Sequence, residues 1–248
     1  MATLVAMTPV LLAFDTSTQA LAVALQWAGG RQAWNGPGGA QASTLLLPTV
    51  QRLMDEAGLG FDDLDAIGFG RGPGAFTGVR TACSVAQGLA FGADKPVLPI
   101  DSLLIVAEDE RARSGWPAEL EVAVGMDARM GELYAARYRW TAQRWRVLRA
   151  PGLWAPQAWA ADCRTGAEAG QGAAQQPVWT GSGLPLLGEA VAPGGRLTCQ
   201  DRAAALLRLA DQAWQEGRAV PAQQALPVYL RDKVAQTTAE RQALKAGA

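Results

Sequence analysis

GRGPGAFTGVR, residues 70–80, connects an apolar run at 64–69 to an Ala-rich segment at 81–91. Seven of its eleven residues are Gly, Ala, Pro or Thr. The apolar run is typical of a buried strand, and the segment after the loop is typical of a helix with Thr77 as its N-cap. A glycine loop between a strand and a helix therefore predicts an α/β fold.

Two interpretations of this loop are open. In the first, backbone amides near Gly72 and Gly74 hold an anion at the helix start, helped by Arg71 or Arg80. In the second, the glycines allow a positive φ and let the strand turn sharply into a packed helix. The loop has neither the Gly-Lys of a P-loop nor the GxGxxG spacing, which favours the structural interpretation.

The segments on both sides of the loop predict two related α/β lobes. Each half begins with a strand that ends in Asp, followed by a turn and two more strands, and each has a later strand that runs into glycines. Residues 1–104, completed by 221–248, are expected to form the N-terminal lobe, and residues 105–220 a smaller C-terminal lobe. Residues 151–176 are expected to be irregular surface, and residues 201–217 helical.

Composition excludes several kinds of function. The chain has 248 residues, of which 22 are basic and 23 acidic, and this balance argues against a free-standing nucleic-acid binder. It contains no histidine, which excludes a Ser-His-Asp triad and an HExxH metal site. Its three cysteines form no CxxC pair. With no signal peptide or membrane-spanning run expected, we predict a cytoplasmic protein without a membrane partner.

Two acidic turns are candidates for a vestigial nucleotide or anion site. The DTST turn follows the first strand, and Asp127 takes the matching place in the second half. Sugar kinases and actin-like ATPases have an Asp at this place, but there a Gly usually follows, whereas the side chains here obstruct a phosphate. Turn capping is the alternative for both acids. The candidate residues are Asp15, Thr16, Ser17, Thr18, Gly72, Gly74, Thr77 and Asp127.

The helix expected at 43–57 has one apolar face. Leu46, Leu47, Val50, Leu53 and Met54 follow the helical repeat. Such a face packs either into the core of its own chain or against a partner helix, and the sequence leaves both possibilities open.

Four segments together resemble one family. FDTST at 14–18, GFGRGPGAFTGVRTACSVAQGLA at 68–90, MDARMGELY at 126–134 and PVYLRDKVA at 227–235 are similar, in order and spacing, to the bacterial TsaB (YeaZ) proteins. The resemblance covers residues 11–235. It implies an ASKHA (actin/Hsp70-like) fold of two RNase H-like lobes, with mixed β-sheets flanked by helices.

The resemblance also implies a role without chemistry of its own. TsaB-like proteins bind the catalytic subunit TsaD, which the ATPase TsaE joins, and the complex transfers threonylcarbamoyl to the adenosine beside the anticodon of tRNAs that read ANN codons. By resemblance, this chain has no cofactor or metal of its own. ATP or ADP and Mg²⁺ lie at the complex interface or on the partners, and tRNA is met only through the complex.

By resemblance, the first-lobe helices pair with TsaD, or with a second copy of this chain when TsaD is absent. The implied interface consists of Leu46, Leu47, Val50, Leu53, Met54, Val79, Ala82, Cys83 and Ala86. Older protease labels of the M22 type gain no support, because the His pair that holds metal in TsaD-type proteins is missing and Ala42 lies near the expected place. The alternative function is an autonomous ASKHA kinase or carbamoyl transferase that uses Asp15 and Asp127.

Overall fold

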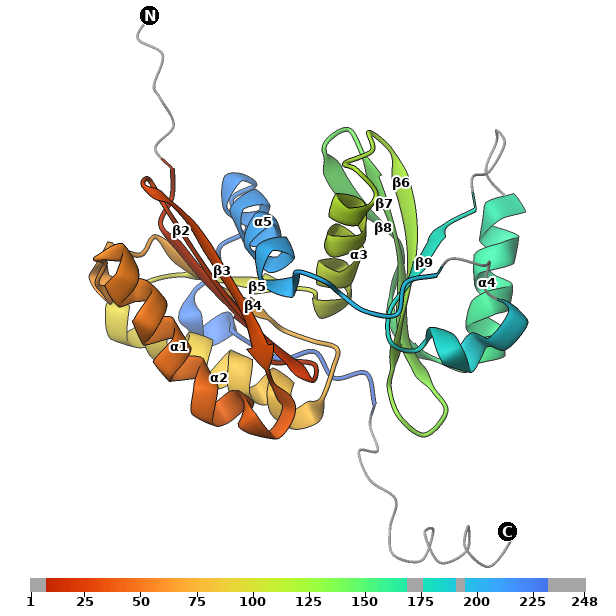
Figure 1. Cartoon of the computed structure of the whole chain (residues 1–248), viewed down its shortest axis with the longest axis horizontal. Coiled ribbons are helices and arrows are strands. Elements are labelled where there is room, and N and C mark those ends of the chain that lie inside the picture. The colour runs from red at the N-terminus through yellow and green to blue at the C-terminus, as the bar shows by residue number, and fades with distance from the viewer. Residues whose placement is uncertain (1–7, 169–175, 191–194, 232–248) are drawn as a thin grey trace, which may run out of the picture.

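The computed structural model describes residues 8–168, 176–190 and 195–231, which form two lobes side by side (Figure 1). The first lobe contains a five-stranded sheet in the order β3-β2-β1-β4-β5. Strand β2 is antiparallel to both of its neighbours, β1 and β3, whereas β4 and β5 run parallel to β1. The bounds are β1 Leu11–Asp15, β2 Ala20–Trp27, β3 Gly30–Pro37, β4 Ala66–Gly70 and β5 Val97–Ile100.

Helices cover both faces of this first sheet (Figure 1). Side chains alternate along a strand, so Leu12 and Phe14 of β1 pack toward α1 and α2, whereas Leu11 and Ala13 pack toward α5. The result is one core on each side of the sheet. The bounds are α1 Ala42–Ala57, α2 Phe76–Ala93 and α5 Arg202–Gln215.

The second lobe contains a four-stranded sheet in the order β8-β7-β6-β9, in which β9 is parallel to β6. Helix α3 packs on the face toward the first lobe, and α4 covers the other face together with the 3-10 segment η3. The bounds are α3 Ser102–Arg113, β6 Leu120–Asp127, β7 Leu133–Thr141, β8 Arg144–Trp154, α4 Pro156–Glu168, β9 Val178–Thr180 and η3 Leu184–Ala190. The structure thus has the two mixed, helix-flanked sheets that were expected.

The expected lobe boundary at residue 220 is wrong for α5. This helix follows the second sheet in the chain, but its buried face, including Ala203, Leu206 and Ala210, packs on the first sheet. The apolar stripe of a helix packs wherever an open apolar face exists, and here that face is the back of the first sheet. The first lobe is therefore completed from α5 onward. Residues 222–225 also lie against α2, whereas 232–248 are outside the described residues.

Two local expectations were also wrong. Residues 151–168 are not irregular, since β8 extends to Trp154 and α4 follows, with Trp159 and Cys163 buried four residues apart on its inner face. Residues 169–175 of the same stretch lie outside the described part. Thr77 does not cap α2, because the helix begins at Phe76 after Ala75 and Thr77 lies within its first turn.

Of the described helices, none combines the length and apolar composition needed to cross a bilayer.

Candidate functional site

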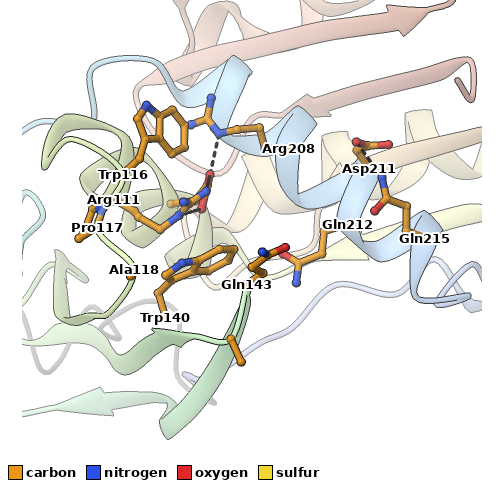
Figure 2. Close-up of a pocket in the computed structure, with 12 residues that line it drawn as sticks. Arg111, Trp116, Pro117, Ala118, Trp140, Gln143, Arg208, Asp211, Gln212 and Gln215 are labelled. Carbon is orange, nitrogen blue, oxygen red and sulfur yellow. Dashed lines mark hydrogen bonds and ion pairs between the residues drawn. The ribbon is translucent and has the colours of Figure 1, made fainter.

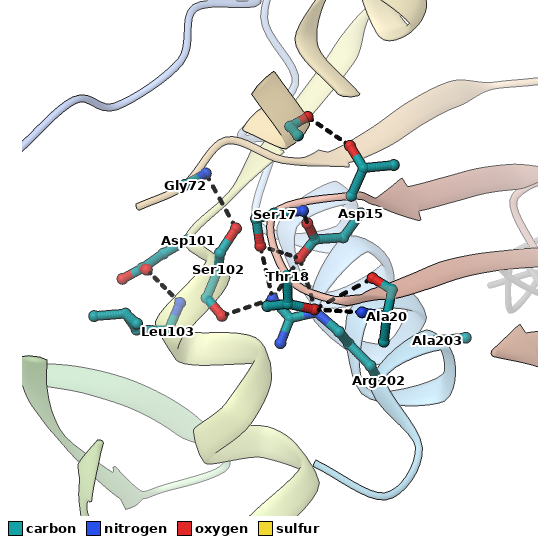
Figure 3. Close-up of polar contacts among 12 residues, drawn as sticks. Asp15, Ser17, Thr18, Ala20, Gly72, Asp101, Ser102, Leu103, Arg202 and Ala203 are labelled. Carbon is teal, nitrogen blue, oxygen red and sulfur yellow. Dashed lines mark hydrogen bonds and ion pairs between the residues drawn. The ribbon is translucent and has the colours of Figure 1, made fainter. Parts of the chain in front are cut away.

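The acidic turn after β1 is closed by a buried ion pair (Figure 3). Asp15 is fully buried, and its Oδ2 accepts hydrogen bonds from Nε of Arg202 at 3.0 Å and from Nη2 at 2.5 Å. The Ser17 amide donates to Asp15 Oδ1 at 2.6 Å, which makes the turn cap that the sequence left as an alternative. Arg202 also donates to Ser17 Oγ and to the Ser102 carbonyl. The Asp15 carboxylate is therefore bound by residues of its own chain.

The charge of Arg202 is stabilised in this position. Burial is the strongest single influence and lowers the pKa of Arg202, but the interactions with Asp15 and Cys199 together outweigh it and raise this pKa above its ordinary value. A carboxylate that could coordinate Mg²⁺ in an ATPase here neutralises an arginine instead. Arg202 was not among the site residues predicted from the sequence. A charged residue on the apolar face of the 202–213 helix was the signal that could have indicated it.

The glycines of the opening loop lie against the same turn. A Cβ at Gly78 would be 1.9 Å from the Thr16 carbonyl oxygen, and one at Gly74 would be 2.4 Å from the Ser17 carbonyl oxygen. Thr16 Oγ1 donates to the Gly78 carbonyl at 2.6 Å, and the Ala75 amide donates to the Ser17 carbonyl at 2.8 Å. In a phosphate loop, glycines let the backbone come close to a bound phosphate. Here Gly74 and Gly78 instead let the loop backbone come close to the backbone of Thr16 and Ser17.

The start of the loop is held by α3. Gly72 has φ +98°, a conformation that favours glycine, and its amide donates to Ser102 Oγ at 3.0 Å. The Ser102 amide in turn donates to the Gly72 carbonyl at 3.0 Å. This pair of hydrogen bonds ties the strand-to-helix turn to the helix that begins the second lobe, so the loop acts as a structural junction.

The second acidic turn lies across a cavity from the first. Asp127 Oδ1 accepts from the Arg129 amide at 2.7 Å, and Oδ2 pairs with Arg129 Nη1 at 3.3 Å, which is the turn-capping alternative. Asp127 lines a cavity of about 570 Å³ between the lobes together with Ser17, Thr18 and Gly74. The cavity lining does not include Asp15, Thr16, Gly72 or Thr77. Four of the eight candidate residues thus line one cavity and four do not, and the fully buried Asp15 carboxylate does not face Asp127 across it.

Other residues complete this cavity. Phe76, Met126, Met130 and Tyr134 give it apolar walls, and Arg202 and Arg231 also line it. Arg231 donates to the Ala128 carbonyl and pairs with Glu132 at 2.5 Å, so its charge is neutralised. Apolar walls and paired charges do not make a polyphosphate site.

A buried hydrogen bond joins the two lobes nearby. Tyr138 on β7 donates its hydroxyl to Asp101, which also accepts from the Leu103 amide as the N-cap of α3. Burial raises the pKa of Asp101, although the Tyr138 hydroxyl partly offsets the shift. The same burial raises the pKa of Tyr138 well above its ordinary value. This contact positions the lobes and does not point into an open site.

The residues expected at the partner interface are mostly core. Leu47 is 48% exposed, whereas the other eight, from Leu46 to Ala86, are buried, and seven of those eight pack in one cluster beneath the first sheet. The apolar stripe of a helix on a sheet faces that sheet, so the periodic residues of α1 and α2 could not also face a partner. The prediction that the eight buried residues contact a partner is therefore wrong. These residues are Leu46, Val50, Leu53, Met54, Val79, Ala82, Cys83 and Ala86.

Comparison with known proteins identifies the family. A family model described as TsaD, tRNA N6-adenosine threonylcarbamoyltransferase, matches residues 39–185. The tRNA threonylcarbamoyladenosine biosynthesis protein TsaB of Escherichia coli K12 is 32% identical over 245 residues, which cover 91% of this chain and 96% of that protein. The TsaB protein of Haemophilus influenzae is 45% identical over 124 residues, but there the match spans only about half of each chain, 50% and 51%.

Solved structures agree with the sequence relatives. YeaZ from Pseudomonas aeruginosa superposes with a TM-score of 0.75 at 37% identity and covers 90% of this chain and all of its own. A second P. aeruginosa structure, of an uncharacterized protein described as similar to the peptidase YeaZ, has a TM-score of 0.78 at 38% identity with the same coverage. The expected fold and family are confirmed, and the chain belongs to the TsaB (YeaZ) family of tRNA threonylcarbamoyladenosine biosynthesis proteins.

Proposed function

We propose that this chain is a non-catalytic scaffold and activator subunit that binds TsaD, with TsaE, for threonylcarbamoyl transfer to the adenosine next to the anticodon of tRNAs reading ANN codons. The observation that carries this proposal is the closed turn after β1. Asp15 is paired with Arg202, and Gly74 and Gly78 lie against the Thr16 and Ser17 backbone. A turn filled by its own chain argues for a structural role.

The same observation bears on cofactors. With the Asp15 carboxylate neutralised by Arg202, ATP or ADP and Mg²⁺ belong on the partner subunits or at the complex interface, and the chain has none of its own. Because the complex acts on tRNA, which is made in the cytoplasm, the chain acts there. During the modification reaction, the chain meets tRNA only within the complex.

The partner surface is the outer side of α1 and α2, opposite the buried stripe. Leu47 is the exposed leucine of α1. On α2, Ser84, Gly88 and Gly92 lie four residues apart, and a Cβ at either glycine would meet no atom within 4 Å. Residues spaced by four share one helix face, and small side chains let a partner helix approach closely. TsaD occupies this surface in the complex, and a second copy of the chain occupies it when TsaD is absent.

A charge at Leu47 tests this surface. We expect Leu47→Glu to abolish co-purification with TsaD, because the contact would lose the roughly 1.5–3 kcal/mol of a buried leucine and gain an unpaired carboxylate. Since the side chain is 48% exposed in the free chain, the thermal stability of the isolated variant should be unchanged. Pull-down and calorimetric titration with TsaD measure the first effect, and a melting curve measures the second.

Leu226→Glu is the matched control, since Leu226 is also an exposed leucine but lies outside α1 and α2. It should bind TsaD as the unmodified chain does. Full TsaD binding by Leu47→Glu would show that the partner surface lies elsewhere.

Reconstitution tests the function itself. TsaD and TsaE with threonylcarbamoyl-AMP and an unmodified tRNA transcript should form the modified adenosine only when this chain is added. This chain without TsaD should form none, because Asp15 is held by Arg202. Modification by the chain alone, lost in Asp15→Asn, would instead support the alternative of an autonomous kinase or carbamoyl transferase that uses Asp15 and Asp127.

A further inference from the structure

A second cavity, of about 600 Å³, lies outside the site described above (Figure 2). It opens between α5, the loop after α3 at 114–118, and the tip of the β7–β8 hairpin. Two indoles, two guanidinium groups and three glutamine amides line it. Flat aromatic and guanidinium surfaces next to amides are the chemistry that stacks a nucleobase and hydrogen-bonds its edge.

The flat groups of this cavity form a stack. The Cζ atom of Arg111 lies 3.8 Å from the ring centroid of Trp140 and 4.5 Å from that of Trp116, and Arg208 lies 4.9 Å from the Trp116 ring. Trp116 is nevertheless 51% exposed. An indole that is backed by cations and open to solvent offers a surface on which a further ring can stack.

A buried carboxylate fixes the stack in place. Glu108 accepts hydrogen bonds from Arg111 at 2.9 Å, from Arg208 Nε at 2.6 Å and from the Trp145 indole at 2.9 Å. Within the described residues, the two terminal nitrogens of Arg208 have no acceptor. Glu108 and Asp211 together balance the two arginines, so the cavity is close to neutral and suits an uncharged ring better than a phosphate.

Three residues that line the cavity have a positive φ. Trp116 has φ +58°, and Ala142 and Gln143 at the hairpin tip have φ +49° and +58°. Residues with a bulky side chain rarely adopt this left-handed conformation, and where they do the site is often a ligand clamp. The positive φ values at Ala142 and Gln143 are those that a two-residue hairpin turn requires, whereas Trp116 has no such explanation, and both turns direct a side chain, Trp116 or Gln143, to the same cavity.

The hairpin beside the cavity is basic. Residues 133–161 contain five arginines and six Tyr or Trp residues but no Asp or Glu, although the whole chain has a net charge of −1. Arg137 and Arg139 pair with Glu121. Arg144 and Arg146 are exposed and have no ion pair with any described residue. Side chains alternate along β8, so both arginines project from the face opposite Trp145, and they reach the phosphates that flank a bound base around the hairpin tip.

We propose that this cavity holds one unpaired base of an RNA strand, stacked at Trp116, while Arg144 and Arg146 contact the neighbouring phosphates. The base edge hydrogen-bonds Gln143 and the open nitrogens of Arg208. That the RNA is a tRNA rests on the proposed function, whereas the cavity itself is tested on the isolated chain.

The test measures fluorescence anisotropy of a fluorescein-labelled, unmodified anticodon stem-loop transcript at low salt. Trp116→Ala should weaken binding by about 5- to 150-fold, the range for loss of one stacked base. Phe91→Ala, which removes an equally exposed aromatic residue on α2, should change binding less than about two-fold, since no base stacks there. Arg144→Gln with Arg146→Gln should reduce the slope of log Kd against log salt by about 1.4, whereas Arg52→Gln should not.

A second measurement does not depend on how the variants fold. Ultraviolet cross-linking of the unmodified chain to the stem-loop should place cross-links on Trp116, Trp140 or Gln143. Leu47→Glu should bind the stem-loop normally, so failure of the partner surface and failure of this site are distinguishable. Equal RNA affinity for Trp116→Ala, or cross-links confined to other surfaces, would overturn the proposal. Saturation of the cavity by AMP without binding of the stem-loop would overturn the assignment to RNA.

Discussion

Replacing Arg202 with leucine is expected to lower the free energy of unfolding by about 3–5 kcal/mol, because it leaves the Asp15 carboxylate buried without its counter-charge. Asp15 is fully buried, and Arg202 donates both of the guanidinium hydrogen bonds that reach its Oδ2. The leucine cannot replace these bonds or the one to Ser17 Oγ. Urea denaturation followed by circular dichroism measures the loss as a lower midpoint at an unchanged slope.

An exposed ion pair provides the comparison. Arg52 and Glu56 on α1 lie 3.2 Å apart with nearly half of each side chain exposed, so Arg52→Leu should cost less than about 1 kcal/mol. The double variant Asp15→Asn with Arg202→Leu should recover part of the loss, because no net charge remains buried. If Arg202→Leu were as mild as Arg52→Leu, the ion pair would not be what holds the turn after β1.

A methyl group at Gly78 should have the second large effect. A Cβ there would lie 1.9 Å from the Thr16 carbonyl oxygen, which is backbone and cannot rotate away. The turn after β1 must then move from α2 and lose the hydrogen bonds from Thr16 Oγ1 to the Gly78 carbonyl and from the Ala75 amide to the Ser17 carbonyl. We expect Gly78→Ala to destabilise the chain by about 2–4 kcal/mol in the same denaturation assay.

The same helix supplies a matched control. Gly88 is also in α2, but a Cβ there meets nothing within 4 Å. Gly88→Ala should therefore stabilise the isolated chain by about 0.5–1 kcal/mol, the helix preference for Ala over Gly. Opposite signs for the two substitutions would show that Gly78 is needed for packing and not for flexibility. Two equal, small effects would mean that the turn and α2 are not in contact.

Local patterns were enough to predict most of the fold. The apolar run at 64–69 contains most of β4, and each half of the chain begins, as expected, with a strand that ends in Asp, namely β1 and β6. The helices expected at 43–57, 81–91 and 201–217 correspond to α1, α2 and α5. The family resemblance rested on the glycine loop and the two acidic turns, which are close-packed positions where few residue types fit.

The same patterns failed where a residue's role depends on what lies across the molecule. Apolar periodicity identified the faces of α1 and α2 that are buried, and these were mistaken for a partner surface, since periodicity carries no sign of whether a face meets its own sheet or another chain. The lobe boundary failed for a related reason. Helix α5 lies between the sheets, and only the open apolar back of the first sheet shows where it packs.

The residues alone were sufficient for most of the elements, the family and the exclusion of histidine chemistry, because these depend on local periodicity and on which residue types are present. Three-dimensional packing settled what the acidic turn does. Asp15 and Arg202 are 187 residues apart in the chain, and no local pattern relates them. Folding places the guanidinium against the buried carboxylate and the glycines against the turn backbone, and this packing makes GRGPGAFTGVR a structural junction.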